Sequence, residues 1–249
     1  MDEILSDQEL LRYNRQIVIR AFDMDGQEAL KQAKALVLGA GGLGCAAAQY
    51  LVTAGIGEIT LVDFDHVELS NLQRQVLHRD SRIGINKARS AAEELSGLNP
   101  HVTINVVDRL LDEPELAAAV AEHSIVLDCT DNLMTREQLN RFCFEAKVPL
   151  ISAAAIRMEG LVTVFDYGED KPCYQCFASL FGEQQLSCVE SGILAPVVGM
   201  VGCLQATEAV KQISGMGRTL SGRILMIDAM TMEFREMGLP KRPGCPVCG

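Results

Sequence analysis

Residues 35–44, Ala35-Leu-Val-Leu-Gly39-Ala-Gly41-Gly42-Leu-Gly44, join a short apolar run to four closely spaced glycines. The segment that follows, Cys45 to Thr53, is helical in composition. A strand that ends in a glycine-rich turn and opens a helix is the context of the dinucleotide fingerprint GxGxxG. Glycine lets the backbone turn sharply and approach a phosphate, and the helix N-terminus adds free N–H groups and the positive end of a dipole. The stretch predicts a nucleotide site in an α/β domain.

An acidic residue stands at the expected distance from this turn. Asp63 ends the next apolar run, which begins at Glu58, and lies 19 residues after Gly44. A carboxylate at this position can accept hydrogen bonds from ribose hydroxyls. The glycines alone are compatible with a tight turn that holds no ligand. The strand, the helix and Asp63 together favour a nucleotide, with NAD as the default choice.

Apolar runs and helical segments alternate over most of the chain. Such alternation indicates βαβ units and a mainly parallel sheet. We therefore expect an α/β, Rossmann-like fold with helices on both faces of the sheet, continued by antiparallel strands after Gly160. The expected strands are 35–38, 58–63, 103–107, 125–128, 148–152, 161–167, 223–228 and 230–237. The expected helices begin after the capping box Ser6-Asp7-Gln8-Glu9 and span 27–34, 45–53, 87–98, 113–122, 136–146 and 196–213.

Composition narrows the possible partners and compartments. The 249 residues carry a formal net charge of −11, so a nucleic acid is an unexpected partner. Hydrophobic residues make up 48% of the chain. The acidic first residues do not resemble a secretory signal. Residues 35–57 lack charge over a length that could span a membrane, but their six glycines favour a strand, a turn and a buried helix. We expect a cytoplasmic protein with no membrane segment.

A polar cluster downstream of Asp63 argues against a nicotinamide enzyme. Arginine and lysine, here Arg74 and Lys87, neutralise charge on phosphates, and nearby amides orient phosphate oxygens. Asp131 follows the expected strand 125–128, and a loop carboxylate at such a strand end can hold Mg²⁺. Each residue alone could be a solvated surface group or a helix cap. Their joint position after successive parallel strands favours a site for a nucleotide triphosphate. The chain contains no P-loop motif.

The segments around Gly39–Gly44, Asp63, Ser70–Gln75, Lys87 and Cys129–Asn132 resemble the adenylating domain shared by ubiquitin-activating enzymes and their bacterial relatives. The resemblance covers essentially the whole chain as a single adenylating domain, residues 1–249. Its parts would be N-terminal helices in 1–34, a nucleotide-binding part in 35–155, and a carrier-binding, zinc-bearing part in 156–249. Within the superfamily, segments 155–160 and 187–196 resemble the molybdenum-cofactor branch, with the thiamine branch as the alternative.

The resemblance implies roles for individual residues. Asp63 would hold the ribose and Gly42 would lie against the nucleotide. Arg15 would reach the site of a neighbouring subunit, which implies a homodimer. Asn86 stands before Lys87, where the family pattern has proline. The residues implied to bind ATP are Gly39, Gly41, Gly42, Gly44, Asp63, Ser70, Asn71, Leu72, Gln73, Arg74, Lys87, Asp131 and Asn132, with Asp131 on Mg²⁺ and Arg15, Arg74 and Lys87 as the cationic groups.

Four cysteines form two C-x2-C pairs, Cys173 with Cys176 and Cys245 with Cys248. Four thiolates fill a tetrahedral zinc shell and leave no open position, which favours structural zinc over a redox dithiol or buried free thiols. Cys188 lies in a polar stretch, and in the related enzymes a cysteine here forms a thioester or persulfide with the carrier. Adenylation itself needs no thiol, so a bystander cysteine is the alternative. The histidines show neither ligand nor triad spacing.

The resemblance implies ATP-dependent adenylation of the C-terminal glycine of a small ubiquitin-like sulfur carrier ending in Gly-Gly, with release of pyrophosphate. In the molybdenum-cofactor branch the carrier is the small subunit of molybdopterin synthase. We expect no sulfurtransferase domain after the second cysteine pair and therefore expect a separate sulfur-donor protein. The alternatives are the same reaction on the thiamine-pathway carrier, an NAD-dependent dehydrogenase, a non-catalytic dimer that binds a ubiquitin-like protein, and activation of a carboxylate on tRNA.

Overall fold

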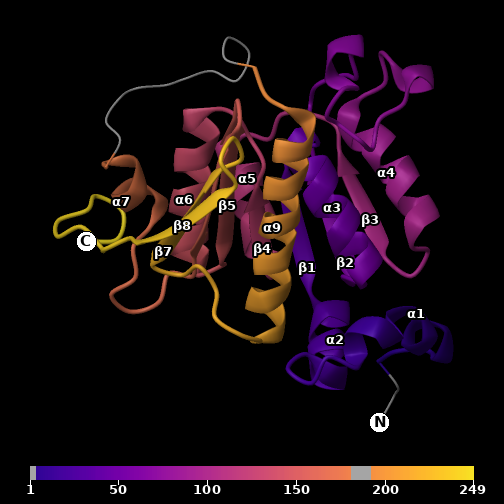
Figure 1. Ribbon diagram of the computed structural model, residues 1–249, viewed down its shortest axis with the longest axis horizontal. Coiled ribbons are helices and arrows are strands. Elements are labelled where there is room, and N and C mark those ends of the chain that lie inside the picture. The colour runs from indigo at the N-terminus through magenta and orange to yellow at the C-terminus, as the bar shows by residue number, and fades with distance from the viewer. Residues whose placement is uncertain (1–3, 181–191) are drawn as a thin grey trace.

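A computed structural model describes residues 4–180 and 192–249 and contains one eight-stranded sheet of order β3-β2-β1-β4-β5-β6-β7-β8 (Figure 1). The first five strands run parallel, and β6, β7 and β8 are antiparallel to their neighbours. The expected fold class is thereby confirmed. The strands are β1 (Lys34–Leu38), β2 (Glu58–Val62), β3 (Thr103–Val107), β4 (Ile125–Asp128), β5 (Leu150–Ile156), β6 (Glu159–Phe165), β7 (Arg223–Asp228) and β8 (Glu233–Gly238).

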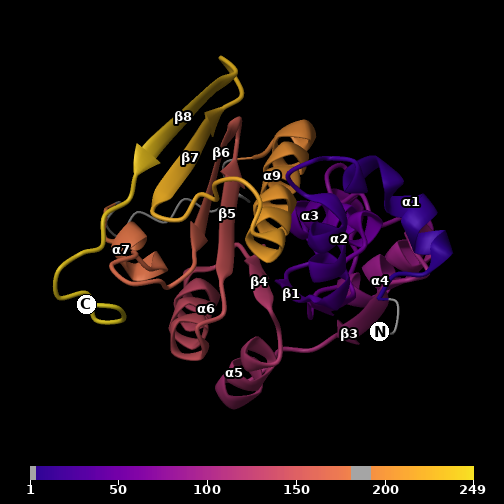
Figure 2. The ribbon, with the colours of Figure 1, turned by 90° about the horizontal axis from the view of Figure 1, so that it is seen from below.

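Helices cover both faces of this sheet (Figure 2). One face is packed against α2, α3, α4 and α9, and the other against α5, α6 and α7. The N-terminal helix α1 packs on α2 and lies away from the sheet. The helices are α1 (Asp7–Ile17), α2 (Asp23–Gln32), α3 (Gly42–Ala54), α4 (Lys87–Leu98), α5 (Glu113–Ala121), α6 (Leu133–Ala146), α7 (Tyr174–Ala178) and α9 (Ala195–Ser214), with the short 3-10 turns η1 (Leu69–Asn71) and η2 (Asp80–Arg82).

Strand β1 shows why the central apolar runs do not alternate with polar residues. Ala35 and Val37 belong to the core on one face of the sheet, whereas Leu36 and Leu38 belong to the core on the other face. Successive side chains of a strand point to opposite faces, so a strand covered on both sides must be apolar throughout. The uncharged stretch 35–57 is therefore β1, a glycine turn and the buried helix α3. No helix of the described residues combines the length and apolarity of a membrane span.

Most element bounds agree with the expectation to within a few residues, and two regions differ. The last strand begins at Glu233 instead of residue 230, because residues 229–232 form a turn. In this turn the Asp228 carboxylate accepts hydrogen bonds from the backbone of Met230 and Thr231, and Met232 has a φ of +56°. The short helix α7, which carries Cys176, was not expected, because five residues are too few for a periodic pattern.

The N-terminal capping box predicts a measurable pH dependence. The Glu9 carboxylate accepts hydrogen bonds from the backbone N–H and the hydroxyl of Ser6, and it forms an ion pair with Lys31 at 2.6 Å. Burial opposes the charge, but these contacts outweigh it and lower the pKa of Glu9 from 4.5 to about 2. A carboxyl group whose pKa is lowered by folding stabilises the fold at pH values above its pKa in the unfolded chain. This contribution is lost as the pH falls from 4.5 towards 2. Replacing Glu9 with glutamine should cost about 1–3 kcal/mol at pH 7.

Urea unfolding of the wild type and of Glu9→Gln at several pH values checks this expectation. The difference in unfolding free energy should be largest at neutral pH and should narrow below about pH 4.5. Lys31 keeps a second partner in the variant, because its ammonium also donates to the His101 carbonyl at 3.0 Å. A difference that stays constant from pH 7 to pH 3 would contradict the assigned pKa.

Candidate nucleotide and zinc sites

The glycine turn lies between β1 and α3, where each glycine meets a different constraint. Gly39 has a φ of +96°, and a Cβ there would lie 2.7 Å from the Cys129 carbonyl oxygen. A Cβ on Gly44 would lie 1.8 Å from the Gly39 carbonyl oxygen, and one on Gly42 would meet Val198 at 2.8 Å. These three glycines are required by packing. Gly41 differs, because a Cβ there would meet only the Gln75 amide nitrogen, at an ordinary contact distance of 3.7 Å, so close packing does not fill the space beside this residue.

The start of α3 offers backbone donors to that space. Gly41 is the N-cap residue and brings no side-chain cap to the helix. The first N–H groups of a helix have no partner within the helix and attract anions. The turn is thus suited to bind phosphate.

Asp63 reaches back from the end of β2 to the same turn. Its Oδ2 accepts a hydrogen bond from Ala40 N at 2.7 Å, and its Oδ1 accepts one from Asp65 N at 2.9 Å. Burial raises the pKa of Asp63, and these backbone donors and the nearby Lys87 oppose that shift. The carboxylate is consequently fixed in direction beside the glycine turn, and its remaining lone pairs can accept from a ribose.

Asn86 fixes the segment before α4 through hydrogen bonds, where the expected proline would restrict the backbone. Its side-chain oxygen caps α4 by accepting from Arg89 N at 3.1 Å. Its amide nitrogen donates to the carbonyls of Asp63 at 2.8 Å and Asp65 at 3.1 Å. The side chain therefore ties the segment after β2 to the start of α4, where Lys87 is located.

The two cationic side chains occupy different settings. Lys87 is buried, and its ammonium pairs with Asp65 at 3.0 Å. Arg74 donates to the Ser70 carbonyl at 3.1 Å, and its Cγ lies 3.6 Å from the position of a Cβ on Gly42. Arg74 thus lies close to the beginning of α3, and Lys87 lies close to Asp63. Both cations are near the place that a polyphosphate bound beside the turn would occupy.

The segment around η1 holds Arg74 in place. Asn71 is buried, and its side-chain oxygen accepts from Glu68 N at 3.1 Å. Its backbone carbonyl accepts from Arg74 N at 3.1 Å. Asn71 therefore shapes the loop, Leu72 is half-buried beside it, and Gln73 is exposed.

Asp131 follows β4 in a loop next to the glycine turn, since Gly39 touches Cys129 of that loop. Its carboxylate is exposed. The neighbouring Asn132 caps α6 by accepting from Thr135 N at 2.9 Å. An exposed carboxylate beside a phosphate-binding turn fits the oxygen ligands that Mg²⁺ prefers. The expected magnesium ligand and the glycine turn thus share the carboxyl edge of the sheet.

Two polar groups at this edge were not assigned a role from the sequence. Gln75 is 4% exposed, its amide nitrogen faces Gly41, and its side-chain oxygen has no hydrogen-bond partner within residues 4–180 and 192–249. Asp128 is buried, and its carboxylate accepts from the Thr130 hydroxyl at 2.7 Å and the Ser152 hydroxyl at 3.1 Å. Arg136 lies 3.5 Å from the same carboxylate. Asp128 therefore anchors the loop that carries Asp131.

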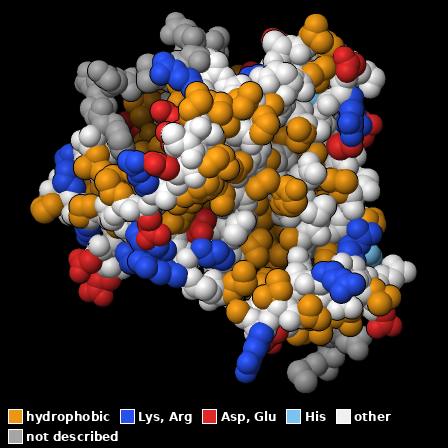
Figure 3. Space-filling view, viewed as in Figure 1, with side chains coloured by type: hydrophobic (Ala, Val, Ile, Leu, Met, Phe, Trp, Pro, Cys, Tyr) orange, Lys and Arg blue, Asp and Glu red, His pale blue; other side chains and the backbone are white. Residues whose placement is uncertain are grey.

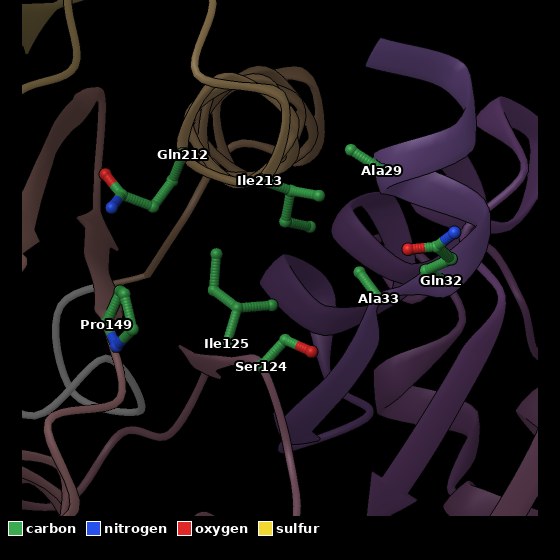
Figure 4. Close-up of a pocket in the computed structure, with 8 residues that line it drawn as sticks. All are labelled: Ala29, Gln32, Ala33, Ser124, Ile125, Pro149, Gln212 and Ile213. Carbon is green, nitrogen blue, oxygen red and sulfur yellow. The ribbon is translucent and has the colours of Figure 1, made fainter. Parts of the chain in front are cut away.

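Arg15 lies at the opposite edge of the sheet from the glycine turn. It is exposed on α1, which packs on α2, and α2 directly precedes the amino end of β1 (Figure 1). A cavity of about 350 Å³ also opens at this edge, between α2, the end of α9 and the beginnings of β4 and β5 (Figure 4). Its lining is Ala29, Gln32, Ala33, Ser124, Ile125, Pro149, Gln212 and Ile213, which includes no expected site residue.

The four cysteines of the two C-x2-C pairs come together in one buried cluster. Their sulfur atoms all lie within 4.8 Å of one another. Between the two pairs, the sulfur atoms of Cys173 and Cys245 lie 3.6 Å apart and those of Cys176 and Cys248 lie 3.5 Å apart. Ligands at 2.3 Å from a tetrahedral zinc ion lie about 3.8 Å apart, whereas a disulfide requires about 2.05 Å. The donor set and its spacing fit zinc, which would fix the C-terminal segment to α7. Cys188 lies outside the described residues.

Comparison with known proteins agrees with this arrangement. Residues 13–247 match the ThiF family. The chain is 60% identical over 245 residues to the molybdopterin-synthase adenylyltransferase of Escherichia coli strain K12, with 98% of both chains covered. It is 55% identical over 236 residues to the protein of that name from Haemophilus influenzae, covering 95% of this chain and 97% of the other. It is 42% identical over 247 residues to the adenylyltransferase and sulfurtransferase MOCS3 of Drosophila persimilis, covering 98% of this chain and 54% of that one.

Solved structures show the same architecture. Escherichia coli MccB with ATP has a TM-score of 0.83 at 26% identity, with 100% of this chain and 76% of that chain covered. PaaA also has a TM-score of 0.83 at 26% identity, with 97% and 77% covered. The family match extends over nearly the whole chain and includes the glycine turn, Asp63, Asp131 and three of the four clustered cysteines. The protein therefore belongs to the ThiF family.

Proposed function

We propose that this protein adenylates the C-terminal glycine carboxylate of the small, ubiquitin-like subunit of molybdopterin synthase, using ATP and releasing pyrophosphate, in molybdenum-cofactor biosynthesis. The observation that carries the proposal is the 60% identity to the Escherichia coli molybdopterin-synthase adenylyltransferase over 98% of both chains. The phosphate-binding turn, the oriented Asp63 and the nearby cations give that reaction a physical basis.

In the proposed reaction the terminal carboxylate of the carrier attacks the α-phosphate of ATP in line with the leaving pyrophosphate. A carboxylate oxygen forms a bond to the α-phosphorus while the bond from that phosphorus to the oxygen of pyrophosphate breaks. The ribose would be held by Asp63, and the phosphates by the N–H groups at the start of α3. Arg74 and Lys87 would offset the negative charge that accumulates on the phosphates. Positioning and charge neutralisation would supply most of the rate.

Asp131 would hold the Mg²⁺ that accompanies ATP, and that ion would offset charge on the phosphate oxygens. The chain's own contribution is the fixed loop geometry, in which Asp128 accepts from Thr130 N at 3.1 Å, just before Asp131. The remaining cation of the site would come from a second copy of the chain. Arg15 lies at the far edge of its own sheet, and beside it Leu11 of α1 is 78% exposed and the C-cap residue Val18 is 68% exposed. These apolar groups support a homodimer in which each Arg15 serves the partner's site.

An apolar groove offers a docking surface for the carrier. It has a volume of about 200 Å³ and lies between the β5–β6 turn, the β7–β8 turn and the start of α9. Exposed apolar side chains on the adjacent turn and on β8, among them Met230 at 74% and Phe234 at 47%, extend this surface. Figure 3 shows hydrophobic side chains gathered on this face of the molecule. Methionine side chains adapt to a partner's shape. The groove is lined by Met158, Leu194, Pro196, Val197, Met200, Ala229 and Met232.

The groove lies at the edge of the sheet that also holds the nucleotide site. It adjoins the carboxyl end of β5, and β5 pairs with β4, the strand that leads to Asp131. A carrier docked there could extend its Gly-Gly tail towards the α-phosphate. We further propose that zinc is structural, that a separate protein donates the sulfur and that the enzyme works in the cytoplasm.

Cys188 is expected to be dispensable for adenylation. Attack of a carboxylate on ATP needs no thiol, so Cys188→Ala removes no group that this step uses and should retain ATP–pyrophosphate exchange within about twofold of the wild-type rate. Exchange by the purified variant in the presence of the carrier measures this directly. Loss of exchange would make Cys188 a participant in the first step.

Carrier-dependent ATP–pyrophosphate exchange by the wild-type protein tests the proposed function. Exchange is expected with the molybdopterin-synthase small subunit and not with the same protein lacking its last two glycines. Exchange with only the thiamine-pathway carrier would keep the chemistry and reassign the pathway. Carrier binding without ATP turnover would indicate a binding protein, and tight NADH binding would contradict the proposal.

A further inference from the structure

Both backbone polar groups of Ala40, at the centre of the glycine turn, are held by side chains. Ala40 N donates to Asp63 Oδ2 at 2.7 Å. The Ala40 carbonyl lies 2.9 Å from His78 Nε2 and accepts from Cys45 Sγ at 3.4 Å. Ala40 itself is 2% exposed. The orientation of the turn next to Gly41 is therefore set by the side chains of Asp63, His78 and Cys45, of which His78 and Cys45 are buried.

The hydrogen bonds of His78 fix its tautomer. A carbonyl oxygen can only accept, so Nε2 carries the hydrogen that points at Ala40. The other ring nitrogen, Nδ1, lies 3.0 Å from the Ser90 hydroxyl of α4 and accepts from it. His78 is 5% exposed, and burial lowers its pKa, which favours this neutral form. The ring thus connects α4 to the glycine turn.

We propose that His78 is a positioning residue for the nucleotide: its Nε2–H holds the Ala40 carbonyl and so directs the N–H groups of the glycine turn towards ATP before ATP binds. The inference rests on the proposed function, because it concerns the same nucleotide site. Glycines leave a turn with high conformational freedom, and ordering that turn on binding would cost affinity. A turn that is already fixed avoids this cost.

Cys45 cannot replace His78 in this role. A thiol is a weak donor, and its 3.4 Å contact with Ala40 is longer than that of the imidazole. Burial raises the pKa of Cys45 to about 12, so the thiol stays neutral and unreactive beneath the turn. His78 is accordingly the stronger of the two donors to the Ala40 carbonyl.

Two amide substitutions separate positioning from general support of the fold. His78→Gln places an N–H group near the position of ring Nε2 and retains a donor to Ala40. The asparagine side chain of His78→Asn is one methylene shorter than glutamine. Its amide reaches the Ser90 hydroxyl and not the Ala40 carbonyl, which is left with weaker hydrogen-bond donors. Both variants put a neutral amide in the same buried site. Ser90→Ala removes the other contact and preserves the bond to Ala40.

The experiment measures the dissociation constant for ATP by calorimetry without carrier, together with the melting temperature without nucleotide. His78→Asn should weaken ATP binding by about tenfold, the effect of one buried hydrogen bond. His78→Gln and Ser90→Ala should stay within about twofold of wild type, whatever their melting temperatures. Equal ATP affinity in the Asn and Gln variants would overturn the inference while leaving wild-type adenylation in place. A wild type that fails to bind ATP would overturn the proposed function as well.

Discussion

Asp131→Ala is expected to reduce carrier-dependent ATP–pyrophosphate exchange by at least about a hundredfold, since removing one group that stabilises developing charge commonly has this effect. The carboxylate is exposed next to the glycine turn, and in our proposal it holds the ion that accompanies ATP. Its removal should leave the fold unchanged, because exposed substitutions usually change stability by less than about 0.5 kcal/mol.

Glu145→Ala is the matched control, because it removes an exposed carboxylate from the other end of α6. Both variants should melt at the wild-type temperature, and only the Asp131 variant should lose exchange. Titrating Mg²⁺ adds a second readout, since Asp131→Asn should need a higher concentration of the ion for its residual rate. An Asp131→Ala variant with wild-type exchange would refute the assigned role.

Cys245→Ser is expected to have the largest effect on stability. Structural zinc contributes directly to folding free energy, and removal of one of its four ligands should cost roughly 3 kcal/mol or more, a fall in melting temperature of about 10 °C. The residues after β8 depend on this contact, because Cys245 and Cys248 join them to Cys173 and Cys176 at α7. The wild type should contain one zinc ion per chain, and the variant should contain much less.

The control for this experiment is Cys203→Ser, since Cys203 is partly exposed on α9 and lies outside the cluster. That variant should keep its zinc and its melting temperature. Metal analysis and thermal unfolding of the three proteins, with and without a chelator, check both points. A wild type free of zinc, with a melting temperature insensitive to the chelator, would exclude the metal.

The order of the elements and the common edge of the expected site could be predicted from the sequence. The glycine turn, Asp63 and Asp131 each follow an apolar run, and the carboxyl ends of parallel strands meet at one edge. The four-cysteine cluster could be predicted for a similar reason, because two C-x2-C pairs supply a complete set of zinc ligands.

The contacts that fix the site could not be predicted in the same way. Burial of Gln75 and His78 depends on how the loop after β2 folds over the glycine turn, and neither residue lies in a periodic segment. Likewise, the contact between Gly39 and Cys129 joins loops that follow two separate strands. Asn86 replaces the expected proline through hydrogen bonds to backbone groups more than twenty residues away. Such interactions follow from tertiary packing and not from local sequence pattern.

The most direct test of the central claim is intact-protein mass spectrometry of the molybdopterin-synthase small subunit after incubation with this protein, ATP and Mg²⁺. We predict a carrier that gains the mass of one AMP with loss of one water, an adduct that hydroxylamine removes because it is an acyl adenylate. Pyrophosphate should appear in equal amount. A carrier that stays unmodified while it binds the enzyme and ATP is present would contradict the account.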